Sequence, residues 1–305
     1  MSARRIRAPT GLDWAHDGPH WPHHAHSRFV EVGVLRWHVQ RFEARSGQPA
    51  PLALLIHGTG ASSHSWRALV PHLTERFDVL TLDLPGHAFT RTPVGHPLSL
   101  GGMTDAVADL LEALRLRPAL VVGHSAGAAI GAQLCLDGRA APAALVAING
   151  ALLPLHGVAG RLFSPLARML AAQPAVPRVF AWGAAQPSML QRLLDGTGSS
   201  LDAEGRRLYG RLVADASHAA GALRMMASWD LQPLARSLPR LPVPLHLLHG
   251  RRDTTVAPAQ SERVQRTVPG STLALLPALG HLAHEEDAAG VHRAMAAATA
   301  AAGGR

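Results

Sequence analysis

The pentapeptide at 123–127, Gly-His-Ser-Ala-Gly, constrains this chain more than any other feature of its sequence. It follows the short apolar run 119–122, which is typical of a strand buried on both faces, and it precedes the helix-like stretch 128–136. A G-x-S-x-G sequence between a strand and a helix predicts a sharp turn that exposes the serine hydroxyl at the edge of a sheet. The flanking glycines leave no side chain to block access. We therefore expect Ser125 to be a nucleophile.

A nucleophilic serine needs a base and an acid, because its hydroxyl is hardly ionised at neutral pH. After a turn of this kind, the acid and then the base follow later strands of the sheet. Asp253 comes after the apolar run 245–248, and His281 comes shortly after the run 271–276. We therefore expect His281 to take the proton from Ser125 and Asp253 to orient His281.

Both assignments have alternatives. Because the chain has 19 histidines, His281 could instead be an ordinary histidine of a surface loop. The nearby His284 is an alternative candidate for the base. The alternative for Asp253 is a turn residue or a helix cap. The other usual place for the acid, after the strand that follows the serine helix, holds Asn149, which cannot carry a charge. The spacing therefore favours Asp253 and His281.

A tetrahedral intermediate also needs hydrogen-bond donors for its oxyanion. The N–H of Ala126 lies at the start of a helix, where unpaired donors favour an anion. We expect the second donor in the loop 57–60, His-Gly-Thr-Gly, and assign it to the N–H of Thr59; the alternative is a simple glycine turn. The neighbouring residues are expected to contact the substrate: His57, Gly58, Gly60 and His124.

Short apolar runs alternate with helix-like stretches along most of the chain. The runs predict buried strands at 52–56, 79–84, 119–122, 144–148, 245–250 and 271–276, and helices are expected at 63–76, 100–116, 128–136, 258–267 and 283–300. Alternating apolar and polar residues around Gly33 predict an antiparallel hairpin at 29–42. Strands that alternate with helices indicate an α/β fold with a mostly parallel sheet flanked by helices.

Residues 151–240 break this alternation. They carry no buried-strand signal, only helix-compatible pieces separated by prolines. We interpret this segment as a helical lid inserted into the core, where it would set substrate choice. The chain then divides into an N-terminal arm (1–27), a core in two pieces (28–150 and 241–305) and the lid.

The positive charge of the chain is concentrated in the lid. All 29 basic residues are arginines, and with 21 acids they give a formal net charge of +8. Residues 151–240 hold ten arginines and five acids, residues 1–7 hold three arginines, and the rest is neutral. Only 4% of residues are aromatic and the arginines are scattered, which argues against nucleic-acid binding. The lid charge suggests an acidic ligand for Arg206, Arg207 and Arg211; the alternative is a solvated surface.

Cysteine, hydropathy and histidine patterns exclude several further classes. The single cysteine, Cys135, excludes an internal disulfide and fits a reducing, cytoplasmic compartment. No apolar stretch reaches the length of a spanning helix. Three arginines in residues 1–7 would supply only roughly 3 kcal/mol at an anionic membrane, which is transient attachment at most. Histidines crowd residues 16–26, but no carboxylate or cysteine stands at a matching ligand spacing, so we expect no metal there.

With the serine turn, the loop 57–60, Asp253 and His281 in this order, residues 28–300 resemble the α/β-hydrolase fold superfamily. The resemblance implies an α/β-hydrolase fold with a helical lid, and a cofactor-free Ser-His-Asp triad that acts on a small-molecule substrate. One departure is Ala88, where the commoner loop of the superfamily has glycine. This conservative change leaves the triad assignment untouched.

A narrower resemblance is carried by six segments: Asp13-Trp14, Trp21-Pro22, 37–40 (Trp-His-Val-Gln), 57–67, 83–87 (Asp-Leu-Pro-Gly-His) and 229–234 (Trp-Asp-Leu-Gln-Pro-Leu). Together they are similar to the magnesium-chelatase accessory proteins, BchO type, of bacteriochlorophyll biosynthesis. This implies a role near magnesium insertion into protoporphyrin, a tetrapyrrole substrate, and magnesium-chelatase subunits as partners. The alternatives are a non-catalytic porphyrin-binding or scaffold protein and a generic carboxylesterase or carbon–carbon bond hydrolase.

Overall fold

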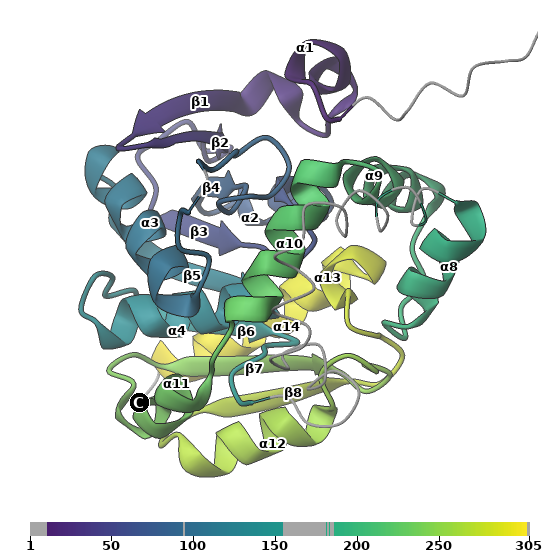
Figure 1. Cartoon of the computed structure of the whole chain (residues 1–305). Coiled ribbons are helices and arrows are strands. Elements are labelled where there is room, and N and C mark those ends of the chain that lie inside the picture. The colour runs from purple at the N-terminus through teal and green to yellow at the C-terminus, as the bar shows by residue number, and fades with distance from the viewer. Residues whose placement is uncertain (1–10, 94, 155–180, 182, 184–185, 304–305) are drawn as a thin grey trace, which may run out of the picture.

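The computed structural model describes residues 11–93, 95–154, 181, 183 and 186–303. These residues form one eight-stranded sheet with the strand order β1-β2-β4-β3-β5-β6-β7-β8 (Figure 1). The strands are β1 (Ser27–Val32), β2 (Leu35–Phe42), β3 (Leu52–Ile56), β4 (Asp78–Leu82), β5 (Pro118–His124), β6 (Ala144–Ile148), β7 (Leu245–Gly250) and β8 (Thr272–Leu276). β1 and β2 form an antiparallel hairpin, β2 pairs antiparallel with β4, and β3 to β8 are mutually parallel.

This sheet confirms the predicted α/β fold, and each expected buried strand overlaps an observed one. β3 shows the physical reason, because all five of its residues are buried. Leu54 and Ile56 belong to the hydrophobic core on one face, and Ala53 and Leu55 belong to the core on the other. Successive side chains of a strand point to opposite faces, so a strand that is apolar throughout must be covered on both.

Helices cover both faces of the sheet. α3, α4 and α12 contribute to one core, and α2 and α14 contribute to the other. The bounds of these helices are α2 (Val70–Leu73), α3 (Leu100–Ala113), α4 (Ala126–Leu136), α12 (Pro258–Thr267) and α14 (Ala288–Gly303). Two layers of helices around a central sheet leave the loops at the carboxyl ends of the parallel strands as the natural place for a site.

The single long helix expected at 63–76 is wrong. The segment holds a short 3₁₀ helix, η3 (Ser63–Trp66), and one α-helical turn, α2. Pro71 lies in the first turn of α2, and because proline has no N–H, the preceding turn cannot continue through it. The helix expected at 283–300 is divided into α13 (Ala283–Glu286) and α14, because Asp287 between them leaves the helical conformation, with φ −143° and ψ 76°.

The described part of the lid segment is helical. It consists of α8 (Pro187–Asp195), α9 (Ala203–Val213), α10 (Ala216–Ser228), α11 (Gln232–Ser237) and the 3₁₀ helix η4 (Leu238–Arg240). In Figure 1, α10 crosses in front of the sheet, and α8 and α9 lie at its side. Residues 155–180, which include three of the lid prolines, lie outside the described residues. The boundaries of arm, core and lid stay a prediction.

The described part of the N-terminal arm, which begins with α1 (Trp14–Asp17), packs through its tryptophans. Trp21 is 3% exposed, and the Trp14 ring lies 5.3 Å from the ring of Phe29 and 4.9 Å from that of Phe89. Among the described residues, no group of three or more His, Cys, Asp or Glu side chains could hold a metal ion. Over the same residues, no helix combines the length and apolar character needed to cross a membrane. The arginines of residues 1–7 lie outside the described part.

Candidate active site

Ser125 occupies a strained turn between β5 and α4. Its backbone has a positive φ of 52° with ψ −117°, which is costly for a residue with a side chain. Gly127 makes the turn feasible, because a Cβ at this position would collide with the carbonyl group of Ile56. The N–H of Ser125 donates to the carbonyl of Ile148 at 3.1 Å, which ties the turn to β6. The strain is therefore held in place by the neighbouring strands.

His281 and Asp253 meet at the end of β7, as their order in the sequence suggests. His281 Nδ1 donates to Asp253 Oδ2 at 2.8 Å, and both side chains are almost fully buried. The other carboxylate oxygen of Asp253 accepts the N–H groups of Thr255 and Val256, each at 2.8 Å. Ser125 and His281 line the same cavity. Within the described residues, no hydrogen bond joins Ser125 Oγ to the imidazole of His281. Such bonds often form only when substrate binds.

Asn149 supports the acid rather than replacing it. Its Nδ2 donates to Asp253 Oδ2 at 2.8 Å and to the carbonyl of Gly280 at 3.1 Å. Burial alone would raise the pKa of Asp253, but hydrogen bonds from His249, His281 and Asn149 outweigh burial and hold the pKa below its ordinary value. From the sequence, Asn149 is recognised only as a residue that cannot serve as the acid of the triad. The pairing of β6 with β7 is the signal that places it beside the acid.

The two histidines nearest to His281 differ in their surroundings. His124 lines the cavity beside Ser125, and its Nε2 donates to the carbonyl of His281 at 2.9 Å. Burial lowers the pKa of His124 to about 3, so the ring is neutral at physiological pH. His284, the competing base, is fully buried against Trp66 and is not among the described residues that line the cavity. The geometry thus brings His281, and not His284, to the serine.

The residues expected to supply the oxyanion donors line the cavity together with the serine. Thr59, Ser125 and Ala126 line the same cavity, and Ala126 is the first residue of α4. Ser125 directly precedes the N-terminus of α4, where the positive end of the helix dipole favours an anion. Gly60, which follows Thr59, also lines the cavity.

His57 and Gly58, expected to contact substrate, are not among the described residues that line the cavity. His57 is fully buried, and both of its ring nitrogens are occupied by backbone groups. Its Nδ1 donates to the carbonyl of Gly58 at 2.7 Å, and its Nε2 accepts the N–H of Leu84 at 2.9 Å. Burial lowers its pKa to about 4. In this geometry His57 connects the loop that carries Thr59 to Leu84, and a contact of His57 or Gly58 with substrate stays a prediction.

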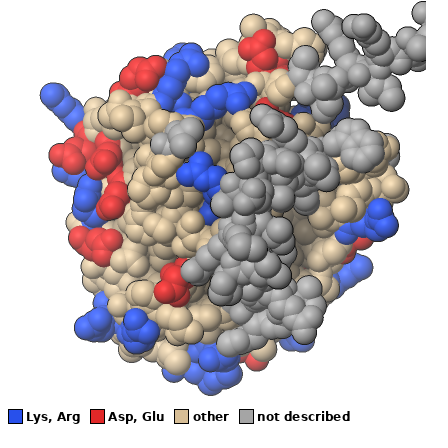
Figure 2. All heavy atoms as spheres, viewed as in Figure 1, with Lys and Arg blue, Asp and Glu red and all other residues tan. Residues whose placement is uncertain are grey.

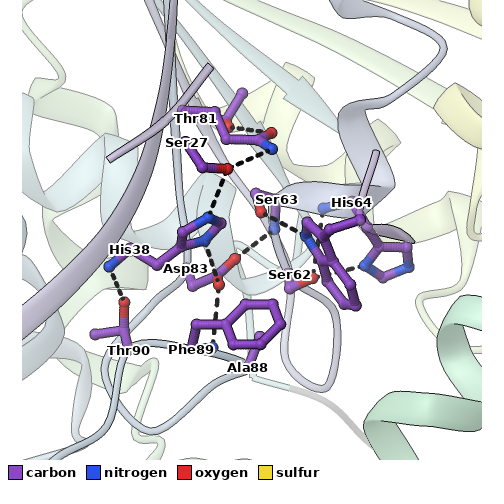
Figure 3. Close-up of polar contacts among 12 residues, drawn as sticks. Ser27, His38, Ser62, Ser63, His64, Thr81, Asp83, Ala88, Phe89 and Thr90 are labelled. Atoms are coloured by element: carbon purple, nitrogen blue, oxygen red, sulfur yellow. Dashed lines mark hydrogen bonds and ion pairs between the residues drawn. The ribbon is translucent and has the colours of Figure 1, made fainter. Parts of the chain in front are cut away.

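Asp83 connects the same loop to the segment that follows β4 (Figure 3). It accepts the N–H of Ser63 at 2.8 Å, the N–H of Phe89 at 3.2 Å and His38 Nδ1 at 2.8 Å. His38 Nε2 in turn lies 2.9 Å from Ser27 Oγ. Although Ser27, His38 and Asp83 repeat the residue types of a triad, His38 and Asp83 are fully buried, so we assign this group a bracing role.

The cavity above Ser125 has a volume of about 310 Å³. The lid helices supply most of its wall with apolar side chains: Leu190, Leu193, Leu194, Val213, Ala219, Ala222, Leu223 and Met226. The polar residues that line it are fewer: Thr59, His124, Ser125, Thr197, Tyr209, His218, Thr255 and His281. A pocket with apolar walls and a few convergent polar groups is typical of a small-molecule site.

A buried ion pair connects α9 to α13 and to the end of η3. Arg67 donates to Glu285 at 2.5 Å and to Asp202 at 2.9 Å, and Tyr209 on α9 donates its hydroxyl to Glu285 at 2.8 Å. Burial raises the pKa of Glu285 to about 7 despite the opposing effect of Arg67. Tyr209 also lines the cavity, so this network connects the lid to the site. No local sequence pattern pointed to it, since its partners are far apart in the chain.

The three lid arginines suggested for an acidic ligand are engaged elsewhere. Arg206 donates to the carbonyl of Leu201. Arg207 pairs with Glu204 at 2.6 Å, and Arg211 pairs with Asp17 at 2.6 Å. None of the three arginines is among the described residues that line the cavity above Ser125. On the face shown in Figure 2, arginines and acidic side chains are interspersed. These side chains therefore give the acidic-ligand hypothesis no support.

Comparison with known proteins agrees with this architecture. A model of the alpha/beta hydrolase fold family matches residues 51–288. The chain is 40% identical over 272 residues to the magnesium-chelatase 30 kDa subunit of Rhodobacter capsulatus, which covers 89% of this chain and 93% of that protein.

Solved structures share the same fold. A bacterial membrane phospholipase A superposes with a TM-score of 0.72 at 25% identity, covering 89% of this chain and 84% of that one. An esterase from Exiguobacterium antarcticum gives a TM-score of 0.72 at 15% identity, covering 89% of this chain and 98% of that one.

Proposed function

Because the chain belongs to the alpha/beta hydrolase fold family, we propose that it is a serine hydrolase that cleaves an ester or a related carbonyl compound. The observation that carries the proposal is one cavity lined by Ser125, at a strained turn, and by His281, which is hydrogen-bonded to Asp253 behind it. Nucleophile, base and orienting acid lie in the order that this mechanism needs.

In the first half of the reaction, Ser125 Oγ attacks the carbonyl carbon while His281 Nε2 takes its proton. Asp253 keeps the proton on His281 Nδ1, which leaves Nε2 free to act as base. The N–H groups of Thr59 and Ala126 stabilise the oxyanion. When the carbonyl re-forms, the leaving alcohol departs with the proton from His281 and an acyl-serine remains.

Water completes the cycle. His281 takes a proton from the water as the water attacks the acyl-serine, and the proton then returns to Ser125 Oγ as the acid product leaves. Every proton in this sequence moves between the serine, the histidine, water and the substrate. The proposal therefore requires no cofactor.

The substrate is proposed to present an apolar group to the lid. Leucine, valine and methionine side chains of α8, α9 and α10 form the cavity wall, so burying an apolar group there is favourable by about 25 cal/mol per Å². The likeness to a magnesium-chelatase subunit supports a place in bacteriochlorophyll biosynthesis, near magnesium insertion into protoporphyrin. A tetrapyrrole is then the proposed substrate, and chelatase subunits are the proposed partners.

Labelling with a fluorophosphonate, which reacts with activated serines, tests the mechanism. Wild-type protein should be labelled and the Ser125→Ala variant should not. Turnover of p-nitrophenyl esters should fall by roughly 10⁴- to 10⁶-fold in the variant. Absence of labelling in folded wild-type protein would overturn the hydrolase proposal.

A second candidate function is a non-catalytic porphyrin carrier or scaffold for the chelatase, which the name of the relative favours. Titration with magnesium-protoporphyrin, followed by Soret absorbance, distinguishes the two. A Soret shift without fluorophosphonate labelling supports the carrier, and labelling without a shift supports an esterase that acts on a different substrate.

A further inference from the structure

One face of the lid helix α10 lies against two loops: the loop after β3, which carries Thr59, and the loop after β4, which carries Ala88. His218, Gly221 and Met225 are spaced by three and four residues, so they share a face of the helix. A Cβ at Gly221 would collide with the carbonyl of Gly86, so the helix backbone touches the loop after β4 directly. Met225 Sδ lies 3.4 Å from the hydroxyl of Thr59, on the other loop. The helix therefore contacts both loops and also forms part of the cavity wall, to which His218 itself belongs.

His218 joins these two loops through both of its ring nitrogens. Its Nδ1 accepts the N–H of Ala88 at 3.0 Å, and its Nε2 lies 3.1 Å from the carbonyl oxygen of Gly60. Because Nδ1 accepts, the ring carries its proton on Nε2 and donates it to Gly60. Burial holds the pKa of His218 below its ordinary value, which keeps the ring in this neutral form.

Each of these two hydrogen bonds restrains a backbone segment whose conformation matters to the site. Ala88 has a φ of 42°, in the left-handed region, where a residue with a Cβ pays roughly 1–2 kcal/mol. Gly60 directly follows Thr59, whose N–H is the proposed second oxyanion donor. A hydrogen bond to the Gly60 carbonyl limits rotation of the backbone next to that donor.

We propose that His218 is a positioning residue, through which the lid helix α10 holds the oxyanion loop in its catalytic geometry. The proposal rests on the serine-hydrolase function proposed above. Asp83 already fixes the two loops to each other at Ser63 and Phe89. His218 adds a second connection, nearer to the serine, and this connection comes from the lid.

Two conservative variants separate the two hydrogen bonds of His218. The amide N–H of His218→Gln can occupy the place of Nε2 and donate to Gly60, whereas the amide oxygen of His218→Asn can occupy the place of Nδ1 and accept from Ala88. His218→Ala removes both bonds. With p-nitrophenyl esters, we expect kcat to fall up to about 100-fold in the Ala variant, since small misplacements of catalytic groups cost this much. The kcat of the Asn variant should fall by a similar factor, because this variant also lacks the hydrogen bond to Gly60.

The Gln variant should retain kcat within about threefold of wild type, and KM should change less than threefold in all variants. His72→Gln, at a histidine outside the described cavity wall, controls for the substitution itself. Equal losses in the Gln and Asn variants, or a rise in KM in place of the loss in kcat, would overturn the positioning role.

Amide hydrogen exchange separates failure of this proposal from failure of the proposed function. Exchange at residues 59–61 should accelerate in His218→Ala and stay slow in His218→Gln, whether or not the protein hydrolyses an ester. Wild-type protein that lacks both labelling and turnover refutes the hydrolase, and the exchange result then decides the role of His218. Unchanged exchange in His218→Ala would refute the positioning role in an active enzyme as well.

Discussion

At the scale of single residues, the proposed catalytic machinery depends on one heavily hydrogen-bonded carboxylate. Asp253 accepts from His281, Asn149 and two backbone N–H groups, so its charge is fixed and its acceptor capacity is nearly filled. Asp253→Asn would keep the shape but favour the wrong tautomer of His281. We expect kcat to fall about 10⁴-fold, measured with p-nitrophenyl esters, with little change in KM. A loss below tenfold would remove Asp253 from the triad.

Asn149 should matter less, because it acts through Asp253. Asn149→Ala removes one donor from the carboxylate, so the pKa of Asp253 should rise and kcat should fall about tenfold. The pH profile of kcat is the measurement that distinguishes this role from a loss of stability. His284→Phe is the matched control, since His284 is buried beside the site but outside the described cavity wall, and it should leave the profile unchanged.

The sequence predicted Ser125, Asp253 and His281 because their signals are local. A strand, a glycine-flanked serine and a helix follow one another directly, and the acid and base each come directly or shortly after an apolar run. The hydrogen bond between His57 and Leu84 could not be predicted, because the two residues are 27 positions apart and the loop sequence does not reveal the contact. Proximity to a motif did not show which way the ring would hydrogen-bond.

At the scale of elements, the lid is attached to the core by a carboxylate with an altered pKa. The pKa of Glu285 is about 7 in the folded protein and near 4.5 when exposed, because burial disfavours its charge. A raised pKa contributes stability below the unfolded value, and this contribution is lost as the pH rises through 7. The glutamine side chain of Glu285→Gln cannot lose a proton. The free energy of unfolding of this variant should therefore rise relative to that of wild type between pH 4.5 and pH 7.

The relative gain should be on the order of 3 kcal/mol, since each pKa unit corresponds to about 1.4 kcal/mol. Urea unfolding of both proteins at pH 5 and pH 8 measures it. Glu286→Gln is the control, because this neighbour accepts only backbone N–H groups, from Gly280 and Ser200. A difference between wild type and Glu285→Gln that does not vary with pH would contradict the assignment.

The strands were easier to predict than the helices because a buried strand carries its signal in a few consecutive apolar residues. The segment 63–76 reads as a helix by composition, yet its course is decided by Pro71 and by the capping of η3 through Ser62. The Arg67–Glu285–Tyr209 network joins three elements separated by up to 218 residues. Contacts of that kind follow from the fold and leave no periodic trace in the sequence.

At the scale of the whole molecule, buried histidines should make the protein sensitive to acid. Burial lowers the pKa of His57 to about 4 and that of His124 to about 3, and it also lowers the pKa values of His64, His87 and His284. The unfolded chain takes up these protons near pH 6.5, so stability is present above that value and is lost as the pH falls below it.

At pH 5, His57 and His124 should each lower the free energy of unfolding by about 2 kcal/mol relative to neutral pH. Urea unfolding between pH 7 and pH 5 should show a falling free energy of unfolding, with more than one proton taken up. The Glu285→Gln background removes the opposing gain from Glu285. A flat profile in that background would show that the buried histidines have partners that stabilise their charged form.

The contacts between the N-terminal arm and the lid also determine when the arm can fold. Leu12 donates its N–H to Asp215 across a separation of 203 residues, and Asp17 pairs with Arg211 across 194. At a synthesis rate of roughly 5 to 20 residues per second, the arm waits about 10 to 40 s for these partners to be made. Trp21 shares its hydrophobic cluster with Leu208 and Leu212 of α9, so this cluster also stays incomplete in that interval. The described part of the N-terminal arm is therefore among the last parts to reach its native contacts on the ribosome.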